Sequence, residues 1–252
     1  MALFDANESL TPFHDDRGSG EYGAILFDQT QLRQVDPRWF DPLQWGSRAT
    51  RVRGSGRGGA WFIDASHGPC VLRQYLRGGL VAKINHDRHL WRGVNRVRSF
   101  AEFRLLRQLC QHRLPVPQPV AACYLRSRFS YRAWIIIERL LEVRSLAELA
   151  IESPADAPWA ATGTMVARFH RQGLDHADLN AHNVLYDSAG KGWLIDLDRG
   201  RLRIPDTAWR EGNLERLLRS LRKVSPPGAH ARIDEGFAQL RQAYDAYWAR
   251  GH

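Results

Sequence analysis

Lysine is nearly absent from this sequence, which has only 3 Lys against 33 Arg in 252 residues. Such a skew is typical of codon bias, and it also suits recognition of phosphate or carboxylate, which the guanidinium binds through a planar fork. Cysteine is scarce too, because only Cys70, Cys110 and Cys123 occur and none has Cys-x-x-Cys spacing. We therefore expect neither a disulfide framework nor a zinc site, and we expect a reducing compartment.

Long hydrophobic runs are also missing. Purely apolar runs such as Ala133–Ile137 are short, whereas a membrane-spanning helix needs roughly 20 such residues. The stretch Met1–Ser9 is too polar and acidic for a secretory signal. We expect a protein that is soluble or lies on a membrane surface. The sequence has no internal repeat, and its length suits one large domain or two small lobes.

Charge is distributed unevenly between the two halves of the sequence. Residues 1–141 carry 21 Lys and Arg against 12 Asp and Glu, a net charge of +9, whereas residues 142–252 carry 15 of each kind. This excess favours an anionic partner such as a nucleotide, nucleic acid or anionic lipid. An RNA-binding protein would need interleaved aromatic and basic signatures. None stands out, so we predict no nucleic-acid partner.

The first half of the sequence has mainly strand patterns. We predict a three-strand meander with a glycine-rich turn between its first two strands, one helix that ends at a proline-rich stretch, and a following hairpin. In chain order, the predicted segments are a mobile leader at 5–20, a strand at Tyr22–Phe27, an irregular segment at Pro37–Trp45, the meander at 51–75, the helix at 83–110, and the hairpin strands Val120–Leu125 and Tyr131–Glu138.

The second half has mainly helical patterns. Ser145 and Glu148 have the spacing of a capping box, which predicts the start of a helix. Further predicted segments are a helix at 157–172, short strands at Val184–Tyr186 and Trp193–Ile195, and helices at about 212–223 and 230–249. The order predicts an α+β fold in two lobes. We place an N-terminal extension at 1–47, an N-lobe at 48–140 and a C-lobe at 141–252.

The strongest chemical signal is the phrase His176-Ala-Asp-Leu-Asn-Ala-His-Asn183, followed by Asp196. Phosphoryl transfer to an alcohol needs one carboxylate to orient the hydroxyl and accept its proton, and further oxygen ligands to hold Mg²⁺ against the phosphates. Asp178 and Asn183 have the spacing of a kinase catalytic loop. We predict Asp178 as the catalytic base and Asn183 and Asp196 as Mg²⁺ ligands. A pair of turn residues beside a surface hairpin is the simpler alternative for any one of them.

These residues resemble the protein-kinase-like superfamily and, within it, the 3-deoxy-D-manno-octulosonic acid (Kdo) kinase family. The resemblance covers about residues 48–225 and implies a bilobal protein-kinase-like fold, ATP and Mg²⁺ as cofactors, and phosphorylation of a Kdo hydroxyl, the 4-hydroxyl, on Kdo-lipid A during lipopolysaccharide inner-core biosynthesis. It is carried by the catalytic loop above and by the phrases Val71-Leu-Arg-Gln-Tyr-Leu-Arg-Gly-Gly-Leu80, Leu114-Pro-Val-Pro-Gln-Pro119 and Leu194-Ile-Asp-Leu-Asp-Arg-Gly200.

Glycines of the meander match the pattern of a loop that covers ATP phosphates. Gly54, Gly56 and Gly59 fit G-x-G-x-x-G, and glycine lets backbone amides approach phosphate without a Cβ clash. Alone the pattern is weak, because glycine clusters are more often plain turns. The third strand departs from the kinase pattern, since Arg73 stands where kinases have lysine. Lys83, the only lysine in the basic half, is the second candidate for the phosphates.

Two glutamates complete the predicted nucleotide site. Glu102 lies on the predicted helix and is our candidate ion-pair partner of Arg73, by analogy with the strand–helix pair of kinases. Its alternative is a surface glutamate paired with a neighbouring arginine. Glu138 follows the apolar end of the predicted hairpin, where the resemblance implies a hinge whose backbone meets adenine. The role of Asp198, which could reach a second metal or hold Arg199, stays open.

Two omissions argue against a regulated protein kinase. Ala177 occupies the position at which such kinases have an arginine that binds a phosphorylated activation loop, and no Ala-Pro-Glu follows Asp196. A small-molecule or lipid-linked acceptor is therefore favoured. His170 and His176 are predicted to be hydrogen-bonded structural residues. Other hypotheses are a heptose kinase or aminoglycoside-type phosphotransferase, and a non-catalytic kinase-like binding module.

The predicted location is the cytoplasmic side of the inner membrane, as a peripheral protein, because the implied acceptor is anchored there by its acyl chains. One mechanism uses basic residues of the predicted 83–110 helix to bind anionic lipid. The alternative is that its arginines face solvent while its apolar face packs into the N-lobe. The residues concerned are Arg88, Arg92, Arg96, Arg104 and Arg107, beside Leu90, Trp91 and Val94.

Overall fold

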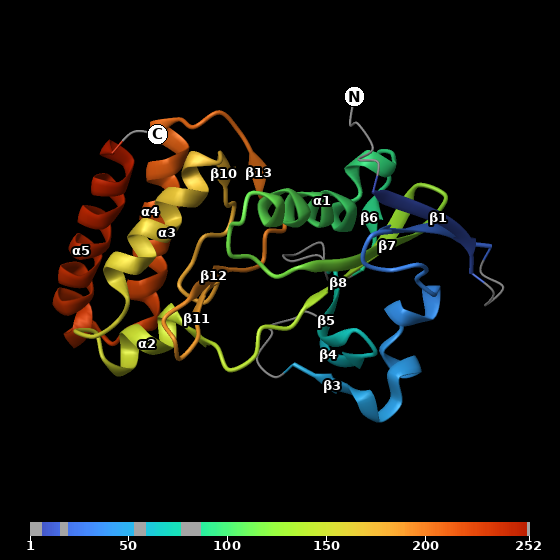
Figure 1. Ribbon diagram of the computed structural model, residues 1–252, viewed down its shortest axis with the longest axis horizontal. Coiled ribbons are helices and arrows are strands. Elements are labelled where there is room, and N and C mark those ends of the chain that lie inside the picture. Colours follow the sequence, from blue (N-terminus) through green and yellow to red (C-terminus); the bar gives the residue numbers. More distant parts are fainter. Residues whose placement is uncertain (1–6, 16–19, 53–58, 77–86, 251–252) are drawn as a thin grey trace. The chain divides into compact units, whose positions relative to one another are not determined.

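The computed structural model describes residues 7–15, 20–52, 59–76 and 87–250. The chain divides into two compact units. Unit 1 comprises residues 1–107 and 118–139, and unit 2 comprises residues 108–117 and 140–252. Figure 1 shows strands in unit 1 and mainly helices in unit 2. The fold is thus α+β, with an antiparallel sheet followed by helices, as predicted.

Unit 1 is built on one antiparallel sheet. Its strand order is β1-β2-β7-β8-β5-β4-β3, and β6 pairs with β8. The strands are β1 Glu8–His14, β2 Tyr22–Asp28, β3 Ala49–Arg51, β4 Ala60–Ala65, β5 Gly68–Gln74, β6 His89–Leu90, β7 Pro119–Ser127 and β8 Ser130–Glu138. The predicted meander is β3–β5, and the predicted hairpin is β7–β8.

Both faces of the sheet centre are covered, which explains why β7 is apolar along most of its length. Helix α1, Arg98–Gln111, lies on one face, where Phe100 contacts Tyr124 edge-on and the Ser99 hydroxyl donates to the Cys123 carbonyl. Two short 3-10 helices, η1 Pro37–Phe40 and η2 Pro42–Arg48, contribute Phe40 and Trp45 to a second buried cluster. The irregular segment predicted at 37–45 is therefore locally helical.

Unit 2 packs helices around two small sheets, β12-β11-β9 and β10-β13. Its elements are β9 Arg144–Ser145, α2 Leu146–Glu152, α3 Trp159–Arg171, β10 Leu174–Asp175, β11 Val184–Tyr186, β12 Gly192–Leu194, β13 Arg201–Leu202, α4 Thr207–Val224, η5 Pro227–Ala229 and α5 His230–Ala249. The capping box of Ser145 and Glu148 is present. Helices α3 and α5 approach closely, because a Cβ added at Gly163 would lie 2.0 Å from the Leu240 carbonyl oxygen.

Three sequence predictions about these elements are wrong. The leader predicted at 5–20 contains β1, which pairs with β2. In the described part of the helix predicted at 83–110, the helix begins only at Arg98, and β6 and a 3-10 turn, η4 Val94–Arg96, precede it. Helix α4 begins at Thr207 rather than near residue 212.

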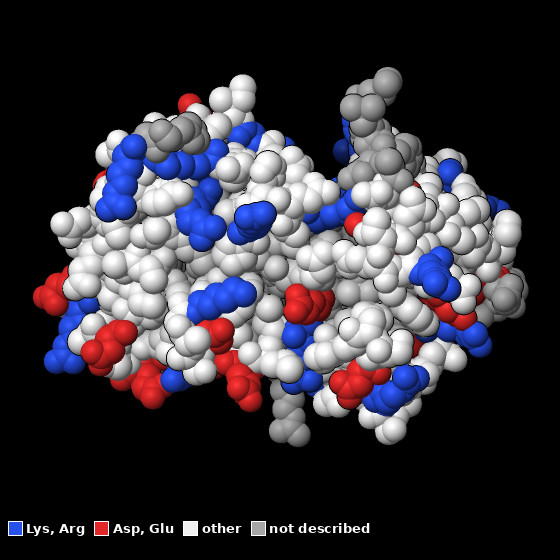
Figure 2. Space-filling model, in the orientation of Figure 1, with Lys and Arg blue, Asp and Glu red and all other residues white. Residues whose placement is uncertain are grey.

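The boundary placed at residues 47 and 48 stays a prediction, although β1 and β2 belong to the same sheet as the later strands. No helix among the described residues is long and apolar enough to cross a membrane. Figure 2 shows Lys and Arg side chains on the surface of both units, so exposed basic residues are not confined to the net-positive half of the sequence.

Candidate active site

The predicted catalytic loop joins β10 to β11 in unit 2 and is anchored at both sides. The backbone N–H of Ala181 donates to the Ser220 hydroxyl on α4 over 2.8 Å, and the Ala181 carbonyl accepts from the N–H of Ala147 on α2. Leu179 and Ala181 are fully buried, whereas Asp178 is exposed. The loop therefore turns its apolar residues inward and leaves the Asp178 carboxylate accessible to a reactant.

His176 links the backbone of Asp178 to the backbone of Ile195, the residue before Asp196. Its Nε2 donates to the Ile195 carbonyl over 3.1 Å, and its Nδ1 accepts from the Asp178 N–H over 3.2 Å. These partners fix the neutral imidazole with its proton on Nε2. Burial lowers the pKa of His176, which favours the same neutral form. His176 is thus a structural, hydrogen-bonded histidine, as predicted, and it ties Asp178 to the residue before Asp196.

Asn183 makes a second link between the same segments. Its Nδ2 donates to the Asp178 carbonyl over 3.0 Å, and its own carbonyl accepts from the Ile195 N–H over 3.0 Å. Because the amide nitrogen is used in this way, the amide oxygen is the atom left to ligate a cation. The structure therefore brings together Asp178, Asn183 and Asp196, the three residues that the sequence analysis selected in this unit.

The hairpin β11–β12 returns the chain to Asp196, as predicted. Val184 pairs with Leu194. The Asp187 carboxylate accepts the backbone N–H groups of Ala189 and Lys191 and so forms the tight turn. Asp196 itself has φ +58°, in the left-handed region. This conformation is uncommon for a residue other than glycine, although aspartate tolerates it, and it is concentrated at functional sites.

The predicted metal ligands fit Mg²⁺ only together with a substrate. Among the residues that the structure describes, no group of three or more His, Cys, Asp or Glu side chains could hold a metal ion. Mg²⁺ is usually bound by one or two carboxylates with substrate phosphates and retained waters. The carboxylate of Asp196 and the amide oxygen of Asn183 are a donor set of this kind.

In unit 1, Arg73 and Glu102 form an ion pair, as the sequence analysis expected. Arg73 Nη2 donates to Glu102 Oε2 over 2.5 Å, and the Tyr75 hydroxyl donates to the same oxygen. Glu102 is only 3% exposed, so this carboxylate needs such donors to be buried at low cost. Strand β5 supplies Arg73, opposite Ile135 of β8, and α1 supplies the glutamate.

The other predicted nucleotide residues are partly outside the described ranges. Gly54, Gly56 and Lys83 lie outside them. Gly59 immediately precedes β4, and its carbonyl accepts from the Gln74 N–H over 3.0 Å. Glu138 ends β8 and is exposed, and its carboxylate accepts from the Gln118 N–H over 3.3 Å.

A basic segment for which the sequence predicted no role in substrate binding follows Asp198. Strand β13 pairs with β10, which places Arg201 opposite Asp175 at the entrance to the catalytic loop. Arg203 forms an ion pair with Asp175 at 2.8 Å, whereas Arg199 and Arg201 are exposed and have no ion pair among the described residues. Arg199 has φ +69°. Only the concentration of arginines after the Asp-Leu-Asp phrase could have revealed this segment.

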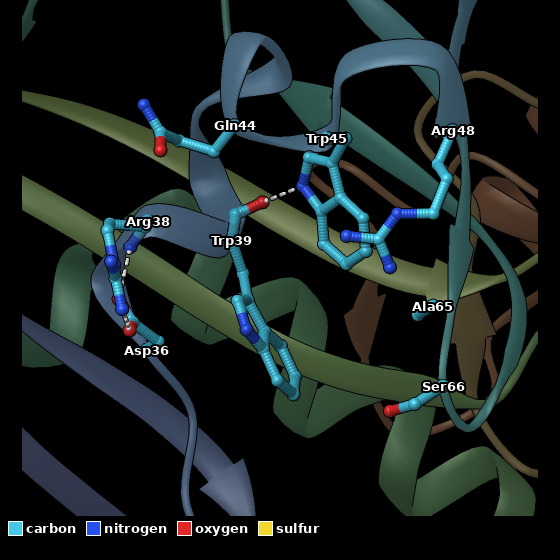
Figure 3. A pocket seen from close by; sticks show the side chains of 8 residues that line it. All are labelled: Asp36, Arg38, Trp39, Gln44, Trp45, Arg48, Ala65 and Ser66. Carbon is cyan, nitrogen blue, oxygen red and sulfur yellow. Dashed lines mark hydrogen bonds and ion pairs between the residues drawn. The ribbon is translucent and has the colours of Figure 1, made fainter.

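One hollow in unit 1 contains none of the predicted site residues. It has a volume of about 230 Å³ and is open to solvent at η1, η2 and the β4–β5 turn (Figure 3). Trp45 Nε1 donates to the Trp39 carbonyl, and Arg38 pairs with Asp36, as the dashed lines show. The hollow is lined by Asp36, Arg38, Trp39, Gln44, Trp45, Arg48, Ala65 and Ser66.

Known proteins match this chain over its whole length. It is 57% identical over 252 residues to a 3-deoxy-D-manno-octulosonic acid kinase of Xanthomonas axonopodis pv. citri (strain 306), which covers all of both chains. It is 58% identical over 251 residues to a protein of the same name from Stenotrophomonas maltophilia (strain K279a), again covering all of both chains. A solved structure of WaaP in complex with acyl carrier protein is 16% identical, with a TM-score of 0.48 over 83% of this chain and 95% of that chain.

The family model of the lipopolysaccharide kinases matches residues 44–244, which include both the Arg73–Glu102 pair and the loop from His176 to Asp196. Together with the identity over the full chain, this match assigns the sequence to a family. The chain belongs to the lipopolysaccharide kinase (Kdo/WaaP) family.

Proposed function

We propose that this chain is a 3-deoxy-D-manno-octulosonic acid kinase. It transfers the γ-phosphate of ATP to a Kdo hydroxyl, the 4-hydroxyl, of Kdo-lipid A during lipopolysaccharide inner-core biosynthesis. The observation that carries the proposal is the catalytic loop. In this loop one imidazole and one amide tie the backbone of Asp178 to the segment that ends at Asp196. The name carried by relatives of the same length supports the choice of acceptor.

Asp178 is the catalytic base in this proposal. Its carboxylate is exposed, while the backbone around it is fixed by Asn183 and His176. The acceptor hydroxyl donates its proton to Asp178 as its oxygen forms the new bond to phosphorus. The bond between the γ-phosphorus and the bridging oxygen breaks at the same centre and ADP leaves. The rate of such a step depends mainly on how precisely the reacting groups are positioned. The rigidity of the loop is therefore as important as the charge of Asp178.

Asn183 and Asp196 are the proposed Mg²⁺ ligands. When bound, Mg²⁺ supplies neutralisation of phosphate charge and fixes the orientation of the phosphate groups. The chain contributes one amide oxygen and one carboxylate. The backbone N–H of Ile195 donates to the backbone carbonyl of Asn183, which keeps the two chain segments that carry these groups together. His176 is not expected to ligate, since both of its ring nitrogens already have partners.

ATP is proposed to bind through unit 1. Gly54, Gly56 and Gly59 cover the phosphates, and Arg73, oriented by Glu102, contacts them, with Lys83 as the second candidate. The fork of Arg73 is suited to this task because it can keep one nitrogen on Glu102 and offer others to phosphate. The backbone beside Glu138 meets adenine.

The acceptor is proposed to meet the segment after Asp198. Kdo is an acidic sugar and lipid A carries phosphates, so recognition needs cations that are not already paired. Arg199 and Arg201 meet this requirement within the described residues, and the β10–β13 pairing fixes Arg201 at the entrance to the catalytic loop. Arg203 has a structural role, because it pairs with Asp175.

The proposed location is the cytoplasmic side of the inner membrane, with the protein attached to the surface. ATP is cytosolic and the proposed acceptor is held in the membrane by acyl chains, so the enzyme must meet both at that surface. Attachment through the arginines of α1 is not the proposed mechanism. Arg104 contacts Glu8 at 3.0 Å, and Arg107 contacts Asp28 at 3.0 Å.

The experiment that tests the function is ATP turnover with purified protein and Mg²⁺, with and without a Kdo-bearing lipid A. We expect phosphate transfer to depend on that lipid. The same lipid without Kdo, a heptose-containing acceptor and an aminoglycoside serve as comparisons. Faster turnover with either of the last two would replace the proposed acceptor with a heptose or an aminoglycoside. Absence of turnover with every acceptor would favour a non-catalytic binding module.

A further inference from the structure

Exposed apolar side chains gather at one end of the sheet in unit 1. Phe129, in the turn between β7 and β8, is 81% exposed, and Leu90 in β6 is 54% exposed. The two are neighbours, because Leu90 pairs with Ser130 and the Trp91 N–H donates to the Phe129 carbonyl over 2.8 Å. Figure 1 shows β6 beside the strands of this sheet. Such clustering of exposed apolar groups marks a contact surface more often than single exposed residues do.

Aromatic and basic side chains flank this turn. The Arg126 guanidinium lies 4.5 Å from the centre of the Trp91 ring and 5.3 Å from that of Tyr22, which is itself 41% exposed. Arg126 Nε also donates to the Arg128 carbonyl over 3.0 Å. We call this set of residues the hairpin-tip surface: Tyr22, Leu90, Trp91, Arg92, Arg126, Arg128 and Phe129.

The basic charge of the hairpin-tip surface is not compensated within it. None of its three arginines has an ion pair among the described residues. Glu21 is adjacent in the chain, but it is buried and accepts from Arg88 at 2.8 Å and from Arg132 at 2.6 Å. Asp15, whose N–H donates to the Glu21 carbonyl, and Asp87 are the other carboxylates nearby in the chain. The surface itself is therefore apolar and cationic.

We propose that the hairpin-tip surface is where the protein contacts an anionic lipid bilayer. Phe129 and Leu90 enter the headgroup region, Tyr22 and Trp91 lie at its boundary, and the arginines contact lipid phosphates. Aromatic rings and the apolar stems of arginine suit this boundary because each combines an apolar body with a polar end. Charge complementarity selects an anionic membrane. The proposed membrane location thereby gains a specific contact surface. Only the choice of a lipid bilayer as the partner rests on that proposed location.

The test is co-sedimentation of the full chain with phosphatidylcholine vesicles, with and without phosphatidylglycerol, across a salt series. Phe129→Ser with Leu90→Ser should lower the partition coefficient about tenfold at every salt concentration, because two exposed apolar groups no longer insert. Arg92→Gln with Arg128→Gln should also lower binding to anionic vesicles about tenfold at low salt, and this loss should shrink as salt rises.

Matched controls lie on the same unit outside the surface. Leu43 is 82% exposed, so Leu43→Ser is the control for the apolar pair. Arg33→Gln with Arg51→Gln is the control for the basic pair, since both arginines are exposed. Each control should stay within about twofold of the wild type. All altered side chains are exposed, so melting temperatures should change little, which separates lost binding from lost folding.

Three results would overturn the proposal. They are no preference of the wild type for anionic vesicles at low salt, unchanged binding of the hairpin-tip variants, and equal losses in the controls. A parallel assay with detergent-dispersed Kdo-lipid A separates this inference from the catalytic one. We expect the hairpin-tip variants to retain wild-type turnover there. A wild type that binds vesicles but transfers no phosphate would contradict the proposed function and leave the surface assignment standing.

Discussion

Removal of the Arg73 side chain should affect both stability and nucleotide binding. Glu102 is buried and accepts from Arg73 and from the Tyr75 hydroxyl. Breaking a buried ion pair costs about 3–5 kcal/mol because the remaining charge has no compensation. Here the Arg73 side chain is 22% exposed and Tyr75 remains as a donor. We therefore expect Arg73→Ala to lower the free energy of unfolding by about 2 kcal/mol, or roughly 4–8 °C in melting temperature.

The same substitution should weaken ATP binding. A hydrogen bond to a charged group contributes about 1.5–3 kcal/mol, which corresponds to roughly 10–150-fold in Kd. Arg73→Lys keeps the charge but loses the planar fork, so its Kd should lie between those of the wild type and of Arg73→Ala. Lys83→Ala should weaken binding less than Arg73→Ala does, since Arg73 is in β5 and directly paired with Glu102.

Calorimetric titration with Mg-ATP, on variants whose melting curves show a folded protein, measures these affinities. Glu102→Gln and the double variant with Arg73→Ala complete a cycle that separates the pair from the phosphate contact. If Lys83→Ala weakens ATP binding more than Arg73→Ala does, Lys83 is the phosphate ligand and the assignment of Arg73 is wrong.

Three further predictions follow from unit 2. Asn183→Ala and Asp196→Ala should each impair Mg²⁺-dependent turnover, in part recoverable by raising Mg²⁺; normal Mg-ATP binding and turnover in both would refute the metal assignment. Arg199→Ala and Arg201→Ala should each raise KM for the Kdo lipid about fivefold, roughly 1 kcal/mol, with KM for ATP unchanged. Arg232 is exposed, and Arg232→Ala is the control. An equal rise in KM for the lipid and KM for ATP would contradict a role of Arg199 and Arg201 in acceptor recognition. Burial, with the charge of Arg210 second, lowers the pKa of His170 to about 3. The unfolded chain therefore binds more protons between about pH 3 and 6.5, so the free energy of unfolding decreases as the pH is lowered through this range, by about 1.4 kcal/mol per pH unit. His170→Gln should reduce this slope in denaturant titrations at pH 7.5, 6 and 5, and an unchanged slope would show that His170 does not cause it.

Short-range patterns in the sequence were sufficient to predict several elements of unit 2 that form or support the site. The capping box at Ser145 needs only its partner three residues later, and the β11–β12 hairpin needs only the turn at Asp187. The loop from His176 to Asn183 is likewise a short-range pattern. The Arg73–Glu102 pair connects residues 29 positions apart, and the sequence indicated it only through resemblance to kinases.

The wrong predictions have physical reasons that involve partners far away in the chain. The spacing of apolar residues before Arg98 resembled a helix, but Gly93 has φ +98°, and Trp91 contacts Tyr124 of β7 instead of a helical neighbour. The segment predicted as a mobile leader at 5–20 contains β1. Glu8 is bound by Arg104 on α1, a contact that no local pattern reveals.

The central claim is that Asp178 activates a Kdo hydroxyl for phosphorylation. Mass spectrometry of Kdo-lipid A after incubation with ATP, Mg²⁺ and the protein tests it most directly. We expect one added phosphate on the Kdo fragment with the wild type, and a rate at least 10²-fold lower with Asp178→Ala, the contribution typical of general base catalysis. The variant should remain folded and bind ATP, because the links from His176 and Asn183 use the backbone of residue 178. Phosphate on another part of the lipid, or an Asp178→Ala rate within about tenfold of the wild type, roughly 1.4 kcal/mol of barrier, would contradict the account.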